Sequence, residues 1–225
     1  MKSFREGKPK AVEKTTANGR EKSIELPKDI MNAGIISQIP KDMMAEANAP
    51  EISAPILWKR ISDRPASALD DLKACNPDYP KDSKWQTNCQ RCVPTYEMRR
   101  RGYDVKAKPA DPNNLYLNQH PYSVWKKPDV ICCKTGNGKS EIEATMAQWG
   151  DNARAQVVLV WKGSNVGHTF IAEQRNGKTV YIDPQVGKEY VDGYFDRAEP
   201  GKTSFCRIDD LTPTLLIYDC CEECE

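Results

Sequence analysis

With 225 residues, of which 39% are hydrophobic, the chain can bury one good-sized core but not two large ones. Its formal net charge of +1 predicts no strong attraction to nucleic acid or to an anionic membrane surface. No stretch approaches the roughly 18 to 20 apolar residues of a membrane span, and the opening residues lack the apolar run of a signal peptide, so we expect a protein made in a cytosol.

The first 60 residues are rich in Lys, Glu, Ala, Pro and Ser, and their only aromatic residues are Phe4 and Trp58. Such a composition offers little apolar surface to offset the entropy that is lost on ordering. We therefore predict a flexible linker or arm over residues 1–60, a folded domain over residues 61–219 and a frayed, cysteine-rich tail over residues 220–225.

The first part of the folded region carries helix and loop signals. Residues 66–75 predict a short helix with Leu69 and Leu72 facing inward, and the turn-rich residues that follow it predict a loop. A second helix is expected to stop at Gly102, a natural C-terminal cap. After it we expect a strand over residues 103–107 and an irregular surface loop over residues 108–128.

The second part predicts a sheet and one more helix. Ser140 and Glu143 fit a capping box, and Gly150 would close that helix. The continuous apolar run at residues 157–161 is typical of a strand that is buried on both faces. Further strands are predicted at residues 167–174, 178–185, 204–208 and 214–218.

The chain has nine cysteines, which in the absence of a secretory signal favour thiol chemistry or metal binding over a disulfide framework. Cys89 follows Asn88, a residue that suits the start of a helix. The first N–H groups and the positive end of the helix dipole would then favour the thiolate form of Cys89. Because a thiolate attacks carbonyl carbon, Cys89 is the candidate nucleophile of a cysteine hydrolase.

Pro94 leaves a second interpretation of this helix open. Proline lacks an N–H, so either a helix that starts at Asn88 kinks, or the regular helix begins near Pro94 with Cys89 and Cys92 in the preceding turn. In the second case the dipole acts less directly on Cys89, and Cys92 is the alternative nucleophile.

Asn176-Gly177 is a strong signal for a two-residue hairpin turn. Counting back from this turn sets His168 opposite Gln185, with Asp183 as a diagonal neighbour on the same face. An imidazole that is oriented by a carboxylate suits general-base catalysis, although such a pair can also be a purely structural, half-buried contact. The only other histidine, His120, lies in a Pro-flanked loop without an obvious carboxylate partner.

Three ordered motifs resemble those of one family. They are the Thr-Asn-Cys-Gln-Arg-Cys run that begins at Thr87, Gly-His-Thr-Phe at residues 167–170 and Val-Tyr-Ile-Asp-Pro-Gln at residues 180–185. Over about residues 84–187 the chain resembles the papain-fold toxin family Tox-PL, which is grouped with bacterial glutamine deamidases. The resemblance implies an α+β, papain-like fold in which a helix that carries the nucleophilic cysteine packs on an antiparallel sheet.

The same resemblance implies roles for individual residues. Cys89 would be the nucleophile, His168 the base and Asp183 the carboxylate that orients it. Papain-like enzymes place a glutamine upstream of the cysteine to help hold the oxyanion, and here Gln86 is the nearest equivalent, with Asn88 as its rival. No metal and no cofactor is implied.

Domains that resemble this one occur in polymorphic toxins, secreted effectors and phage head-associated proteins. We therefore expect a bacterial or phage-encoded protein that is exported or injected into a target cell. The expected partners are a protein substrate and a cognate immunity protein, and neither nucleic acid nor a membrane is expected.

Three classes of function remain open. A thiol hydrolase could deamidate a glutamine side chain or cleave a peptide bond, and the resemblance favours the deamidase. The two C-x-x-C pairs at residues 89–92 and 221–224 could instead hold zinc in a binding or structural module, although they lie far apart in the chain. The third class is a catalytically inactive, phage-associated structural protein.

Overall fold

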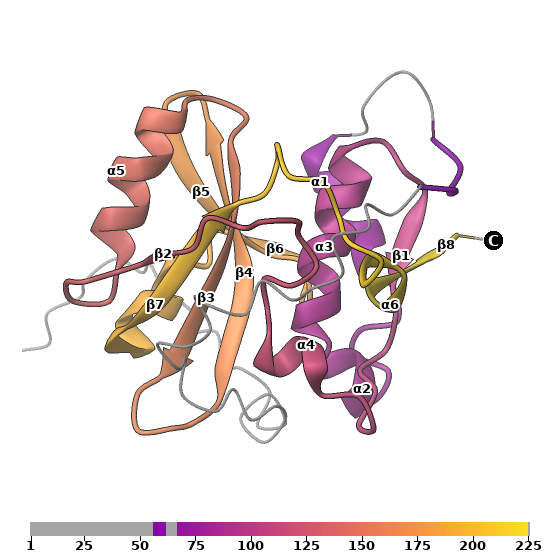
Figure 1. Cartoon of the computed structure of the whole chain (residues 1–225), viewed down its shortest axis with the longest axis horizontal. Helices are drawn as coiled ribbons and strands as arrows, with labels where there is room; N and C mark the ends of the chain where they lie inside the picture. Colours follow the sequence, from indigo (N-terminus) through magenta and orange to yellow (C-terminus); the bar gives the residue numbers. More distant parts are fainter. Residues whose placement is uncertain (1–55, 62–66, 225) are drawn as a thin grey trace, which may run out of the picture.

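The computed structural model describes residues 56–61 and 67–224, so the predicted linker over residues 1–60 lies almost entirely outside the described residues (Figure 1). The helices are α1 (Ala68–Cys75), α2 (Ser83–Gln86), α3 (Cys89–Arg100), α4 (Tyr116–Gln119), α5 (Lys139–Trp149) and α6 (Ile217–Cys220), with a 3-10 helix over Asp192–Arg197. The strands are β1 (Val105–Ala107), β2 (Ile131–Cys132), β3 (Arg154–Trp161), β4 (Gly167–Arg175), β5 (Lys178–Asp183), β6 (Lys188–Glu189), β7 (Ala198–Arg207) and β8 (Cys221–Glu223).

The main sheet has six antiparallel strands in the order β2-β7-β3-β4-β5-β6. Its β4–β5 hairpin has the predicted register, because Arg175 pairs with Lys178 across the turn. Asn176 and Gly177 have φ values of 50° and 74°, the left-handed conformations that a two-residue hairpin turn of this kind requires. The turn signal in the sequence therefore set the register of the two strands that carry His168 and Asp183.

Helices cover the two faces of the sheet, with α5 on one side and α3 and α1 on the other (Figure 1). Alternating strand residues divide the core accordingly. Phe170 and Tyr181 belong to the cluster that contains Ile142 and Met146 of α5, whereas Ile171 and Ile182 belong to the cluster around α3. The predicted α+β architecture, with a cysteine-bearing helix against an antiparallel sheet, is confirmed.

Helix α3 runs without interruption from Cys89 to Arg100, so the alternative in which the regular helix begins near Pro94 is wrong. Pro94 lies inside the helix and cannot donate to the carbonyl group of Gln90 four residues earlier. The thiol of Cys220 lies 3.9 Å from that carbonyl oxygen and donates to it instead. Gly102, with φ 90°, follows the last turn as predicted.

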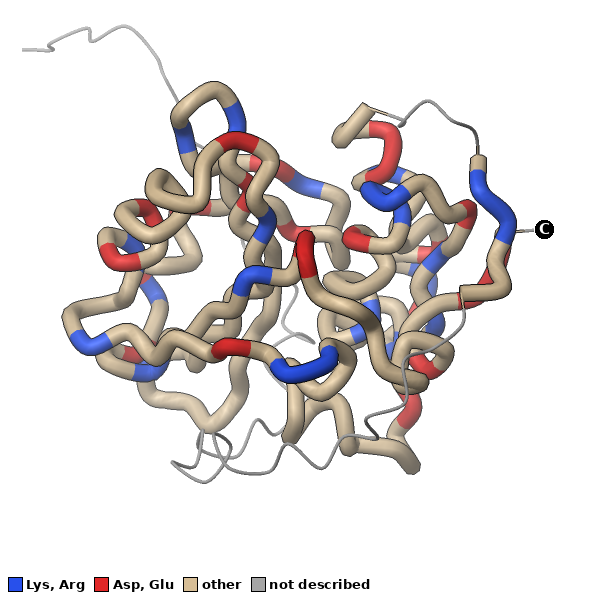
Figure 2. The backbone as a smooth tube through the Cα atoms, turned by 45° about the horizontal axis from the view of Figure 1, so that its top comes forward, with Lys and Arg blue, Asp and Glu red and all other residues tan. Residues whose placement is uncertain are grey.

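The arginines at the end of α3 are paired with buried carboxylates. Asp71 of α1 accepts from Arg100 at 3.1 Å, and Glu97 accepts from Arg101 at 2.7 Å and from Arg154 of β3 at 2.6 Å. Buried charges are costly unless they are paired in this way. Elsewhere positive and negative residues are interspersed along the backbone in the view of Figure 2.

Two expectations about local structure need correction. Leu69 is 46% exposed, and only Leu72 of the predicted pair is buried in α1. The capping box is wrong, because α5 begins at Lys139 and its N-cap is Gly138. A Cβ atom on Gly138 would lie 2.7 Å from the sulfur of Cys133, and its φ of 85° is left-handed, so only glycine fits there.

The end of the chain also differs from the prediction. Residues 214–218 form no strand, and α6 begins at Ile217. The tail that was expected to fray instead forms β8, in which Cys221 pairs with Ala107 of β1. The side chain of Ile217 and the sulfurs of Cys220 and Cys221 are buried, and this apolar burial holds the segment against α3. None of the helices in the described residues is long and apolar enough to cross a membrane.

Candidate active site

His168 and Asp183 lie where the two strands of the hairpin end. His168 is the second residue of β4, Asp183 is the last residue of β5, and both side chains are fully buried. The Nε2 atom of His168 lies 2.9 Å from Oδ2 of Asp183. The diagonal neighbours that the register predicts therefore form a direct hydrogen bond.

The Asp183 carboxylate is held by further donors. The hydroxyl group of Tyr194 donates to Oδ2 at 2.8 Å, and the backbone N–H of Gln185 donates to Oδ1 at 3.0 Å. Tyr194 comes from the 3-10 helix that follows β6. Sequence reasoning missed Tyr194, because no pattern in the chain indicates that this turn folds back onto the end of β5.

Aromatic rings enclose the imidazole of His168. Trp161 stacks on it with a centroid separation of 6.0 Å, Phe170 stacks at 6.1 Å, and Tyr194 contacts it edge-on at 5.5 Å. These rings exclude water, and the lower local polarity strengthens the interaction between His168 and Asp183.

The charges of this pair support each other. Burial by itself would lower the pKa of His168, but the Asp183 carboxylate outweighs it and, together with Cys89, raises the pKa of His168 to about 10. Burial would raise the pKa of Asp183, but His168, Tyr194 and the N–H of Gln185 hold it below its ordinary value. The pair is therefore an imidazolium and a carboxylate at neutral pH.

Cys89 approaches this pair from helix α3. It is the first residue of α3, its side chain is partly exposed, and it acts on the pKa of His168 both as a hydrogen-bonding partner and as a charge. The Nδ1 atom of His168 makes no aligned hydrogen bond to the described residues, and it is the ring nitrogen that Asp183 leaves free. Catalytic contacts are often this loose before substrate binds.

The alternative nucleophile, Cys92, is placed differently. Its side chain is fully buried against Cys75, and burial raises the pKa of its thiol well above the ordinary value. A sealed, protonated thiol is a poor nucleophile. Of the two cysteines in the first C-x-x-C pair, Cys89 is thus the accessible one.

The amides that were considered for the oxyanion have other partners. Asn88 is buried, and its Nδ2 group donates to Asn76 at 3.1 Å and to the carbonyl group of Lys108 at 3.0 Å, which uses both of its N–H bonds. Gln86 donates to the carbonyl group of Pro80 at 3.1 Å, which leaves one N–H free. The structure therefore gives Asn88 a bridging role.

Two other glutamines have buried side-chain amides without a hydrogen-bond partner among the described residues, namely Gln90 and Gln185. Gln90 follows Cys89 directly, and Gln185 follows Asp183 by two residues. Buried polar groups without partners are rare in folded proteins, and here they flank the candidate site in the chain. The hairpin register had placed Gln185 on the face of His168, whereas no signal in the sequence pointed to Gln90.

The cysteine pairs are not arranged as a metal site. Within residues 56–61 and 67–224, no group of three or more His, Cys, Asp or Glu side chains could hold a metal ion. Two adjoining hollows lie beside the N-terminal end of α3, and neither is lined by Cys89, His168 or Asp183.

Comparison with known proteins agrees with this geometry. A family model described as papain fold toxin 1, glutamine deamidase, matches residues 87–188, a range that contains Cys89, His168 and Asp183. No curated protein matches the chain. The activity of the matched family supports an enzyme that hydrolyses amides. Over residues 87–188, which span the cysteine-bearing helix and the hairpin described above, the chain is similar to the papain-fold toxin family of glutamine deamidases.

Proposed function

We propose that this protein is a protein-glutamine deamidase with Cys89 as nucleophile, His168 as base and acid, and Asp183 as the carboxylate that orients His168. The observation that carries the proposal is the hydrogen bond of 2.9 Å between His168 and Asp183, with the partly exposed thiol of Cys89 acting on the same imidazole. Those are the parts that thiol acyl transfer needs.

The proposed reaction has two halves. The Cys89 thiolate attacks the amide carbon of a glutamine side chain, and His168 gives its proton to the nitrogen, which leaves as ammonia while a thioester forms. His168 then takes a proton from water, whose oxygen attacks the thioester, so that glutamate and free Cys89 are released. The backbone N–H of Cys89, at the start of α3, is suited to stabilise the oxyanion in both halves.

Burial favours a side-chain amide over a peptide bond as substrate. The His168 imidazole is 0% exposed whereas Cys89 is partly exposed, so we expect the substrate to approach on the side of Cys89. A glutamine side chain is slender enough for such an entry, whereas a protease must hold the chain on both sides of the cleaved bond. The unpaired buried amides of Gln90 and Gln185 are further candidates to pair with the primary amide.

The matched family is described as a toxin, which supports a protein that acts on a target protein. The same proposal includes an effector role in another cell and an immunity protein in the producing cell. The test is intact-mass spectrometry of candidate target proteins after incubation with the enzyme. A gain of about one dalton per event marks deamidation through the thioester, and fragments would mark a protease.

Three variants give this assay its controls. Cys89→Ser and His168→Ala are each expected to abolish the mass change while the protein stays folded. Cys132→Ser removes an exposed thiol on β2, outside the site, and should leave the activity intact. Full activity of both Cys89→Ser and His168→Ala would refute the mechanism.

A further inference from the structure

Arg91 lies two residues after Cys89, in the first turn of α3, and its side chain is only 4% exposed. Its Nε atom has no hydrogen-bond partner, and within the described residues its guanidinium group forms no ion pair. By contrast, Arg99, Arg100 and Arg101 on the same helix all form ion pairs. A buried guanidinium without a counter-charge is costly, so its presence calls for an anion that the described residues do not supply.

Arg91 lines both hollows beside the N-terminal end of α3. One has a volume of about 390 Å³ and the other of about 440 Å³, and they share Arg91, Ala110, Asp111 and Pro112. Since these walls are common to both, the hollows form one groove, which we call the Arg91 groove. Thr87, Leu115 and Asn118 line one end of it, and Lys108, Asn114 and Asp219 line the other.

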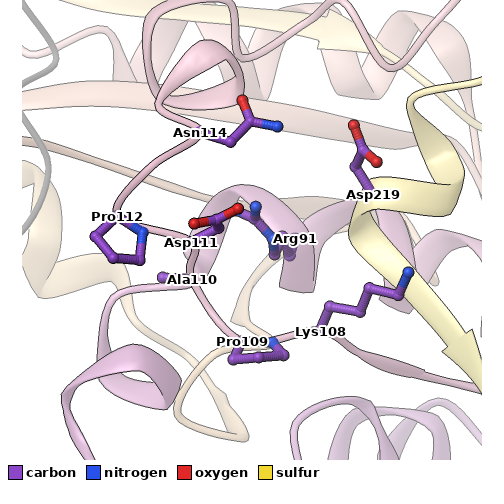
Figure 3. Close-up of a pocket in the computed structure, with 8 residues that line it drawn as sticks. All are labelled: Arg91, Lys108, Pro109, Ala110, Asp111, Pro112, Asn114 and Asp219. Carbon is purple, nitrogen blue, oxygen red and sulfur yellow. The ribbon is translucent and has the colours of Figure 1, made fainter.

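The other charges of the groove do not neutralise Arg91. In Figure 3, Arg91 lies between the segment Lys108–Pro112 and Asp219 on α6. The ammonium group of Lys108 donates to the carbonyl group of Tyr218 at 2.7 Å. Asp111 and Asp219 are exposed at the rim, and Asp111 accepts from the N–H of Asn113 at 2.9 Å. The rim carboxylates disfavour a multiply charged anion, so a single carboxylate is the more suitable partner for the guanidinium.

We propose that the Arg91 groove is a subsite for the protein substrate, in which Arg91 binds the carboxylate of an Asp or Glu side chain near the target glutamine. Cys89 and Arg91 differ by about 3 Å along the helix axis and by about 200° around it. A substrate segment would therefore cross the N-terminal end of α3, where Thr87 lines the groove. This inference rests on the proposed function, because it assigns sequence specificity to that reaction.

Binding to the inactive Cys89→Ser protein tests the subsite without catalysis. The probes are fluorescent glutamine peptides in which one Glu is moved along the flanks, each matched by a peptide with Gln in its place. A hydrogen-bonded charge pair changes affinity by roughly 10- to 100-fold, so at least one Glu peptide should bind that much more tightly than its Gln match. Adding Arg91→Met should abolish this difference, and Arg91→Lys should keep part of it because the charge remains without the two-pronged geometry.

Lys202→Met is the matched control, since it removes one exposed positive charge on β7 and should leave the preference unchanged. Without peptide, Arg91→Met should melt at the same or a higher temperature than the parent, because it removes an unpaired buried charge. A large fall in melting temperature would mark Arg91 as a structural residue and overturn the inference. Displacement of the peptides by low concentrations of inorganic phosphate would also overturn it, since the groove would then be a phosphate site.

The two proposals fail in different ways. If the active enzyme deamidates the peptides with the same kcat/KM whether Glu or Gln flanks the target, the subsite is refuted and the proposed function stands. If the Cys89→Ser protein shows the Arg91-dependent preference but the active enzyme deamidates no peptide and no protein, the proposed reaction is refuted and the binding site stands.

Discussion

Replacing Asp183 by Asn tests the electrostatic core of the site. The two side chains have nearly the same shape, so the substitution removes the charge and keeps an oxygen that can accept from the imidazole. Burial lowers the pKa of His168, but the Asp183 carboxylate and Cys89 together outweigh burial, so that this pKa is about 10. Without that charge, burial dominates, and the pKa of His168 should fall to or below its ordinary 6.5.

The size of the effect follows from these values. The difference between a pKa of about 10 and the ordinary 6.5 corresponds to about 5 kcal/mol of interaction with the charged ring. At pH 7 His168 should be charged in nearly all wild-type molecules and mostly neutral in Asp183→Asn. Because the positive charge beside Cys89 is then lost, we expect Cys89 to be alkylated more slowly at pH 7 in the variant than in the wild type.

The assay combines two measurements. Alkylation of Cys89 by iodoacetamide is followed between pH 5 and pH 11 by peptide mass spectrometry, a range that brackets the expected titration of His168 in the wild type and in the variant. NMR of the imidazole groups follows His168 directly, since the chain contains only two histidines. Asp196→Asn, which alters an exposed carboxylate, should match the wild type in both measurements. An unchanged His168 titration in Asp183→Asn would refute the account of this pair.

Two predictions concern stability. The raised pKa of His168 should contribute stability that is fully present below about pH 6.5 and is lost as the pH rises towards 10. The lowered pKa of Asp183 should contribute stability that is lost as the pH falls below 3.8, the ordinary pKa of an aspartate. The difference in melting temperature between the wild type and Asp183→Asn, measured by calorimetry, should therefore shrink both towards pH 10 and below pH 3.8. A constant difference across pH 6 to 10 would contradict this. Glu97→Gln should cost about 3 to 5 kcal/mol in urea unfolding, because it removes a fully buried charge and leaves two partly buried arginines with a neutral partner. Asp78→Asn, in a surface pair of 3.9 Å, should cost less than about 1 kcal/mol. Equal costs would show that the buried pairs contribute no more than surface ones.

The amino-acid sequence alone determined the local features of the site. The Asn176-Gly177 turn set the register that makes His168 and Asp183 neighbours, and Gly102 marked the end of the cysteine-bearing helix, whose N-cap Asn88 makes no side-chain capping hydrogen bond. These features depend on backbone conformations and on strand alternation, which a few adjacent residues encode. The order of the motifs in the chain also indicated the similarity to the family.

Only the tertiary structure decided which distant residues complete the site. Tyr194 and Trp161 contact the His168–Asp183 pair through the fold of segments that carry no pattern for it, and Asn88 is committed to Asn76 and Lys108. Residues Cys221–Glu223 form a strand because β1 offers an edge and α3 an apolar surface. Burial and charge at a given side chain depend on everything packed around it, so the raised pKa of His168 and the unpaired charge of Arg91 emerge only when the whole core is assembled.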